Sequence, residues 1–187
     1  MSTEKKVANP GPLGLLGFGM TTILLNLHNS GLLPLSIVTV AMGIALGGAA
    51  QVIAGIFEMK HGNTFGGSAF TAYGLFWWSL VLIWVNPVSG NGIANGDSTS
   101  VAYYLLLWGI FSIFMFICTL KHNRITQIVF ATVTLLFLLL SLGDFTGNHT
   151  ITTIAGYVGI FCGAAAIYSA VGQIVNEEYG KTILPLG

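Results

Sequence analysis

Charge is the property that this sequence has least of. Only 6% of its 187 residues are charged, and its six basic residues balance its six acidic ones. A soluble domain carries about a quarter charged residues, so this chain has too few to cover a surface that faces water. The balance of signs also leaves no basic region that would bind a nucleic acid. We therefore predict an integral membrane protein that does not bind nucleic acid.

Cysteine is nearly as scarce, and no arrangement of residues typical of an enzyme is present. Cys118 and Cys162 both fall within apolar runs and form no CxxC pair, so we expect buried packing residues, with neither a disulfide nor a metal site. The four histidines are too scattered to form a metal site within one helix. Because the sequence has no Ser-His-Asp set, phosphate-binding loop or paired carboxylates within one span, we expect no enzyme activity and no cofactor.

Long apolar runs are what the sequence has instead. Six of them are each long enough to cross the hydrocarbon core of a membrane, which is about 30 Å thick. Residues typical of turns separate the runs, among them Pro34 and the pair Asn86-Pro87. We predict one all-α membrane domain over residues 1–187, with six transmembrane helices near 12–33, 35–58, 65–85, 101–120, 124–142 and 151–173.

The positions of the basic residues predict how these spans are oriented. All of them fall in the N-terminal tail, in the second or fourth connection, or in the C-terminal tail: Lys5, Lys6, Lys60, Lys121, Arg124 and Lys181. The connections on the opposite side, with 86–100 and 143–150 among them, contain no Lys or Arg. Connections rich in Lys and Arg remain in the cytoplasm. Both termini are therefore predicted to be cytoplasmic.

Polar side chains within the first two spans gather on single helix faces. In the first span, Phe18, Thr22, Asn26 and Asn29 follow at steps of four, four and three, which places them on one face. The second span contains Gln51 among glycines and alanines. Such groups suit a small polar solute that sheds its hydration, but Thr and Asn also form hydrogen bonds between membrane helices. The sequence alone leaves both interpretations open.

The third span begins with small residues that alternate with hydroxyl groups and aromatic rings, Thr71 and Tyr73 among them. This composition suits a helix that lines a cavity or packs closely against other helices. Tyr73 lies more than two turns into the span, where its hydroxyl needs a partner or a path of water. The tryptophans that follow are interpreted as lipid-facing or interfacial anchors: Trp77, Trp78 and Trp84.

Glu58 is a carboxylate close to the predicted cytoplasmic end of the second span. Ionisable groups within membranes are candidates for function, which makes Glu58 the candidate for proton coupling. An ion pair with nearby Lys60 is the structural alternative, and the sequence does not decide between the two.

Four segments of the chain resemble one known family. The first is Asn9–Phe18 (NPGPLGLLGF), which resembles the signature NPAPLGLxGF, with Gly11 where alanine is more usual. The others are Gly19–Asn29, Glu58–Tyr73 and Asn176–Gly180. On these segments the chain resembles the acetate uptake transporter family, and the resemblance spans nearly the whole chain.

The resemblance implies an assembly, a substrate and a constriction. It implies a homohexamer of six-helix protomers in a prokaryotic cell membrane, each protomer with its own path. The expected activity is uptake of acetate, and of succinate in some members, coupled to protons. The family's narrow hydrophobic constriction matches Phe18 and Tyr73 by motif. Its third position aligns with Val133, where the family has leucine, so we expect a slightly wider constriction and looser selectivity.

An ionised carboxylate crosses an apolar constriction only at high cost unless it is neutralised or hydrogen-bonded. We therefore expect acetate to cross in protonated form, held by hydroxyl and amide groups: Thr22, Asn26, Gln51, Thr71 and Tyr73. Three alternatives stay open: a passive channel for the acetate anion, transport of ammonia or ammonium, and a membrane scaffold whose polar faces only hold helices together.

Overall fold

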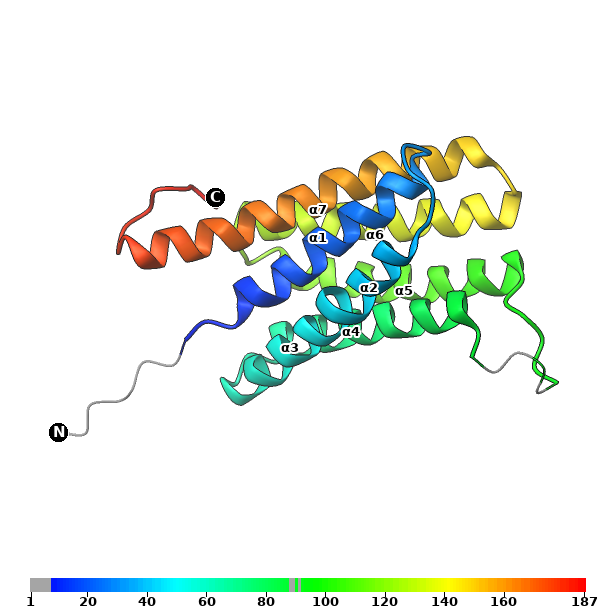
Figure 1. Ribbon diagram of the computed structural model, residues 1–187. Coiled ribbons are helices and arrows are strands. Elements are labelled where there is room, and N and C mark those ends of the chain that lie inside the picture. The colour runs from blue at the N-terminus through cyan, green and yellow to red at the C-terminus, as the bar shows by residue number, and fades with distance from the viewer. Residues whose placement is uncertain (1–7, 88–89, 91) are drawn as a thin grey trace.

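The computed structural model describes residues 8–87, 90 and 92–187. Every regular element within these residues is a helix, and none of them forms a strand (Figure 1). The elements are α1 Gly11–Asn29, α2 Ile37–Met42, η1 Gly43–Ala50, α3 Gln51–Lys60, α4 Thr64–Val85, α5 Ser98–Thr119, α6 Arg124–Thr146 and α7 His149–Glu178. The π-helix η1 joins α2 to α3 without a break, so these three elements form one rod over Ile37–Lys60.

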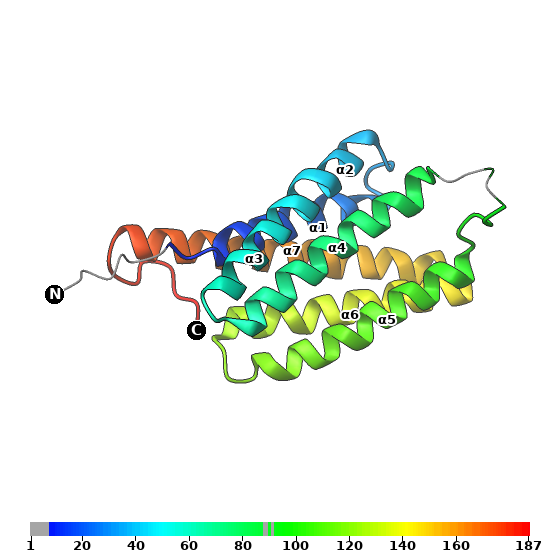
Figure 2. The same ribbon diagram turned by 90° about the horizontal axis from the view of Figure 1, so that it is seen from below.

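The helices run side by side as a bundle, which Figures 1 and 2 show in two views. The most extensive contacts join α1 to α7, α5 to α6, α6 to α7, and α3 to α4. The start of α1 and the last residues of the chain lie at the same end of the bundle, together with the α3–α4 and α5–α6 connections. We call this the terminal end and the opposite one the far end.

Among the described residues, five helical rods are long and apolar enough to cross a membrane: Ile37–Lys60, Thr64–Val85, Ser98–Thr119, Arg124–Thr146 and His149–Glu178. The helix α1 is not among them, because Asn26, His28 and Asn29 lower the hydropathy of its far end. Helix length and composition therefore support a helical protein with several membrane-spanning helices. That α1 is a sixth span stays a prediction.

Short polar side chains fix where the last four helices begin. Four helices start after an Asn or Asp whose side chain accepts a backbone N–H of the first turn: Asn63, Asp97, Asn123 and Asn148. Both the N–H and the hydroxyl of Ser100 donate to the Asp97 carboxylate, and these hydrogen bonds hold the pKa of Asp97 below its usual range. At their other ends, α4 and α6 stop at residues in the left-handed region, Asn86 and Gly147.

The last residues of the chain fold back against the terminal end of α6 and α7. The side chain of Asn176 accepts the backbone N–H groups of Ile183 and Leu184. The carbonyl of Leu186 then accepts the N–H of Ile125 at 3.0 Å, in the first turn of α6. This segment therefore fixes the start of α6, where several side chains face the cavity described below.

The two cysteines have different surroundings. Cys162 is fully buried between α7 and α6, and its thiol donates to the carbonyl of Val129 at 3.5 Å. Cys118 is exposed on α5, so the expectation that it is buried is wrong. An apolar neighbourhood in the sequence of a membrane helix does not tell the protein core from the lipid-facing surface.

Glycines allow α1 and α7 to approach backbone to backbone. A Cβ atom added at Gly163 would lie 2.6 Å from the carbonyl oxygen of Gly19, and one added at Gly19 would lie 2.7 Å from that of Gly163. Main-chain atoms cannot move aside as a flexible side chain can. The contact therefore requires glycine on both helices.

The variant Gly163→Val is expected to weaken this contact. Overpacking of a core costs about 1–3 kcal/mol, and an opposing main chain places the change at the upper end of that range. We expect a lower melting temperature for the detergent-solubilised protein. The matched control is Ala164→Val, one position along on the exposed side of α7, which should melt near the wild-type temperature. Equal melting of the two variants would show that the contact is not tight.

Candidate solute pathway

A cavity of about 270 Å³ opens at the terminal end of the bundle. Polar side chains surround its mouth: Asn9, Glu58, Asn63, His122, Asn123, Thr126 and Gln173. Apolar and aromatic groups dominate deeper in: Leu15, Phe18, Ala69, Phe70, Tyr73, Val129, Phe130 and Val133, with Gln51 as the polar exception. Its lining, as far as the described residues form it, contains neither Lys nor Arg.

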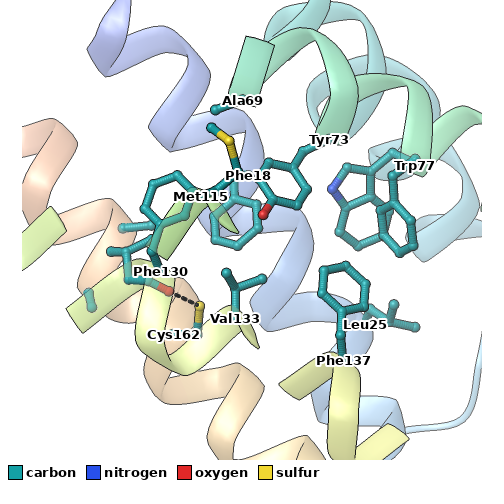
Figure 3. Close-up of a cluster of buried hydrophobic side chains, with 14 of the residues drawn as sticks. Phe18, Leu25, Ala69, Tyr73, Trp77, Met115, Phe130, Val133, Phe137 and Cys162 are labelled. Carbon is teal, nitrogen blue, oxygen red and sulfur yellow. Dashed lines mark hydrogen bonds between the residues drawn. The ribbon is translucent and has the colours of Figure 1, made fainter. Parts of the chain in front are cut away.

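Three side chains from three helices meet at the inner end of the cavity. They are Phe18 of α1, Tyr73 of α4 and Val133 of α6, which are 7%, 4% and 2% exposed. The ring centroids of Phe18 and Tyr73 are 6.0 Å apart, and Figure 3 shows Val133 beside them. We call these three residues the waist. The three positions named from the sequence as a constriction thus lie together in one wall.

The hydroxyl of Tyr73 is directed toward Ser112 of α5, a residue that does not line the cavity. It lies 2.8 Å from Oγ of Ser112, which itself donates to the carbonyl of Trp108 at 2.7 Å. Because Ser112 has one proton to donate, the Tyr73 hydroxyl must be the donor to Ser112. The hydroxyl of Tyr73 therefore has a protein partner, and Tyr73 contributes to the cavity lining as an aromatic residue.

Gln51 is the polar residue in the deeper part of the described cavity lining. Its side chain is fully buried, and its Nε2 donates to the carbonyl of Gly47 in η1 at 2.7 Å. A carbonyl only accepts, so this bond fixes which end of the amide is nitrogen. The remaining Oε1 has no partner among the described residues. A buried acceptor without a partner costs about 1–3 kcal/mol, so a donor that reached this atom would recover that free energy.

Glu58 lies near the mouth and is 7% exposed. Asn63 donates to its Oε2 at 2.7 Å, while its Oε1 is on the side of Gly11. Lys60, the partner considered from the sequence, instead holds its Nζ 5.4 Å from the centroid of the Phe57 ring. The carboxylate of Glu58 therefore faces the cavity with an amide as its neighbour.

The other polar residues predicted along the path do not line the cavity. Thr22 and Asn26 are buried toward the far end, where Asn26 donates to the carbonyl of Thr22 at 2.8 Å and accepts from Asn29 at 3.0 Å. The hydroxyl of Thr71 has no partner among the described residues and faces Gly55, within the contact of α4 with α3. Their place in a path stays a prediction.

A family model matches residues 1–186, which is nearly the whole chain. The chain belongs to the GPR1/FUN34/yaaH family. This GPR1/FUN34/yaaH protein is 53% identical to the succinate-acetate/proton symporter SatP of Escherichia coli K12 over 182 residues, or 97% of this chain and 96% of the symporter. It is 37% identical to ammonia transport outward protein 2 of Saccharomyces cerevisiae over 180 residues, or 92% of this chain and 64% of that protein.

A solved structure described as the bacterial acetate channel SatP has the same fold as this GPR1/FUN34/yaaH protein. The TM-score is 0.94 at 52% identity, and the match covers 97% of this chain and 100% of that one. The family that the sequence motifs indicate is thereby confirmed, and the protein is a multi-pass protein of the cell membrane. The names of these relatives describe SatP both as a proton symporter and as a channel.

The tryptophans of this GPR1/FUN34/yaaH protein do not all face lipid as expected. Trp78 is 37% exposed and donates to the carbonyl of Ile44 at 3.0 Å. Trp77 is only 2% exposed, so its interpretation as an anchor is wrong. Its indole packs against Gly43 and Gly47 of η1, which leave the space that it occupies. Trp77 follows Tyr73 by four residues and therefore lies on the same face of α4. Because Tyr73 is buried, this spacing is the sequence signal that Trp77 is buried too.

Proposed function

We propose that this protein moves acetate and similar short monocarboxylates across the cell membrane, and that the substrate crosses the waist as the undissociated acid. The observation that supports this most directly is the composition of the cavity wall. Glu58 and Gln51 line the cavity, the amide oxygen of Gln51 has no partner among the described residues, and the described lining contains no Lys or Arg. The names of the relatives, a succinate-acetate/proton symporter and an acetate channel, support the substrate class.

The chemistry of Gln51 favours the acid over its anion. Its Oε1 needs a hydrogen-bond donor, and the hydroxyl of acetic acid supplies one, whereas acetate has only acceptors. An anion would also have to leave water for an apolar waist without a cation to compensate its charge. Carrying the undissociated acid is thermodynamically the same as carrying acetate with one proton. The proposed transport is therefore an electroneutral symport.

Glu58 is proposed to exchange the proton at the mouth of the cavity. Its Oε2 is held by Asn63, and its carboxylate lies on the cavity side. Because this end is proposed to face the cytoplasm, an acid taken up by the cell reaches Glu58 after the waist and gives its proton to this carboxylate. In the reverse direction an acetate gains its proton from the same group before it reaches the waist.

Orientation and assembly complete the proposal. All Lys and Arg residues that the structure describes lie at the terminal end: Lys60, Lys121, Arg124 and Lys181. We propose that this end faces the cytoplasm, following the preference of basic connections for that side, with α1 as a sixth span. We also propose a homohexamer with one path through each protomer, as the family resemblance implies.

Ammonium is the second candidate substrate, because a carboxylate and an unpaired acceptor also suit a small cation. The relative named ammonia transport outward protein 2 supports this alternative. A passive channel for the acetate anion is less favoured, because the described lining offers no cation.

The deciding experiment measures labelled acetate uptake into proteoliposomes of the purified protein, with leak from empty liposomes subtracted. We expect accumulation driven by an inward proton gradient and unchanged when valinomycin and potassium set the membrane potential. Uptake that follows the potential and ignores the proton gradient would identify an anion channel. Faster uptake of methylammonium than of acetate would favour the second candidate, and no flux of either would overturn the proposal.

The variant Val133→Leu tests whether the waist sets the size of the substrate. It adds one methylene group at the inner end of the cavity, and a methylene group is worth about 10- to 200-fold in discrimination by an apolar pocket. We expect the ratio of acetate to butyrate uptake to rise by about tenfold, the low end of that range. The control Val171→Leu changes a residue that is 38% exposed on α7. An unchanged ratio in Val133→Leu would place selectivity elsewhere.

A further inference from the structure

The indole N–H of Trp77 is a buried donor without a partner. The side chain is 2% exposed, and Nε1 has no hydrogen bond to any described residue. Buried indole groups ordinarily find an acceptor. Its neighbour Trp78 does so, because its Nε1 donates to the carbonyl of Ile44 at 3.0 Å. The missing partner is therefore a particular property of Trp77.

Trp77 lies directly beyond the waist. It follows Tyr73 by four residues in α4, so the two side chains are neighbours on one helix face. Tyr73 lines the cavity, whereas Trp77 is one turn further toward the far end and does not. Figure 3 shows the indole nitrogen on the edge of the ring that faces Tyr73. If the proposed path continues past the waist along this face of α4, Trp77 is the next residue of α4 that it meets.

The surrounding side chains hold the indole in this orientation. A Cβ atom added at Gly47 would lie 2.7 Å from Cγ of Trp77, and one at Gly43 would lie 3.6 Å from its Cε3. Phe76 packs edge-on with its centroid 5.6 Å from that of Trp77. The indole is enclosed by these contacts, so it cannot turn toward another acceptor without moving η1.

We propose that Trp77 is a specificity-determining residue whose N–H donates to the carboxyl oxygen of the substrate on the far-end side of the waist. This inference rests on the proposed path for short carboxylic acids. Gln51 offers an acceptor for the acid's hydroxyl on the cavity side, and Trp77 offers a donor for its carbonyl oxygen beyond the waist. On the two sides of the waist, the acid thus meets an acceptor for its hydroxyl and a donor for its carbonyl oxygen. Ammonium has no acceptor and gains nothing from Trp77.

The test compares Trp77→Phe with Trp78→Phe in full-length protein in proteoliposomes. Both changes remove an indole N–H and keep an aromatic ring, but only the first removes the unpaired donor. We expect Trp77→Phe to lower the maximal acetate uptake rate about tenfold, with methylammonium flux unchanged and Trp78→Phe close to wild type. Trp77→His keeps a ring N–H and should regain part of the acetate rate.

A spectroscopic measurement does not depend on flux. Ultraviolet resonance Raman bands of tryptophan report hydrogen bonding at the indole nitrogen. Saturating acetate at acidic pH should shift such a band in wild type and in Trp78→Phe, and the shift should be absent in Trp77→Phe. Equal acetate rates in the two Phe variants, with an acetate-induced shift that persists in Trp77→Phe, would overturn the inference. Absence of acetate flux in wild type would instead overturn the proposed function itself.

Discussion

Acetate uptake is expected to fall by about tenfold or more when Gln51 is replaced by leucine, since the acid hydroxyl is then left without an acceptor on the cavity side of the waist, at a cost of about 1–3 kcal/mol. Leucine has a similar size, so the shape of the cavity is retained while the unpaired Oε1 is removed. The acid then loses the acceptor for its hydroxyl. Initial rates in proteoliposomes under an inward proton gradient give the measurement.

The matched control for this change is Gln127→Leu. Gln127 lies on α6, outside the cavity lining, and hydrogen-bonds to the carbonyl of His122 and to Arg124. The same substitution there should leave uptake within about twofold of wild type, as expected of a residue away from the site. Melting temperatures in detergent show whether Gln51→Leu also weakens η1 through the lost bond to Gly47. Wild-type uptake in Gln51→Leu would exclude this amide from the path.

Removing the ring of Phe18 is expected to open the waist to larger acids. In Phe18→Ala the butyrate uptake rate should rise at least about tenfold relative to that of acetate, because an apolar pocket discriminates about 10- to 200-fold per methylene group. The measurement is competition between the two labelled acids in one proteoliposome preparation.

Loss of a buried phenylalanine also costs about 3–5 kcal/mol of stability, so Phe18→Leu serves as a milder second variant. A control at Phe114, which is 64% exposed on α5, tests for effects of lost aromatic rings in general. If Phe18→Ala and Phe18→Leu both fold and keep the wild-type preference for acetate, selectivity does not reside at the waist.

The sequence predicts the helical class well because apolar runs and caps are local properties. Asn63, Asp97 and Asn123 precede their helices as the turn residues suggest. Hydropathy identifies α1 as a membrane span less clearly than the other helices. The amides that α1 buries, such as that of Asn26, lower its mean hydropathy toward that of a soluble helix. The π-helix Gly43–Ala50 could not be predicted, because its conformation depends on tertiary contacts rather than on helix propensity.

The candidate site was predicted only in part. Motif resemblance names Phe18, Tyr73 and Val133, and the structure places all three at the end of one cavity. Thr71 lies between two helices, and Trp77 is buried. Both side chains occupy space left by glycines of the neighbouring rod Ile37–Lys60. Which two helices pack together cannot be read from the hydrophobic periodicity of either helix alone. Polar residues within an apolar span can therefore be recognised in the sequence as buried, but the sequence does not show which of them contact one another.

The hydrogen bond from Tyr73 to Ser112 has a mechanical consequence. No described residue of α5 lines the cavity, yet α5 holds the hydroxyl of a waist residue. The opposite side of α5 is exposed, with Leu107 and Phe114 prominent on it. We therefore expect a displacement of α5 to move the ring of Tyr73 through this hydrogen bond. The width of the proposed path would then depend on what contacts the outer surface of α5.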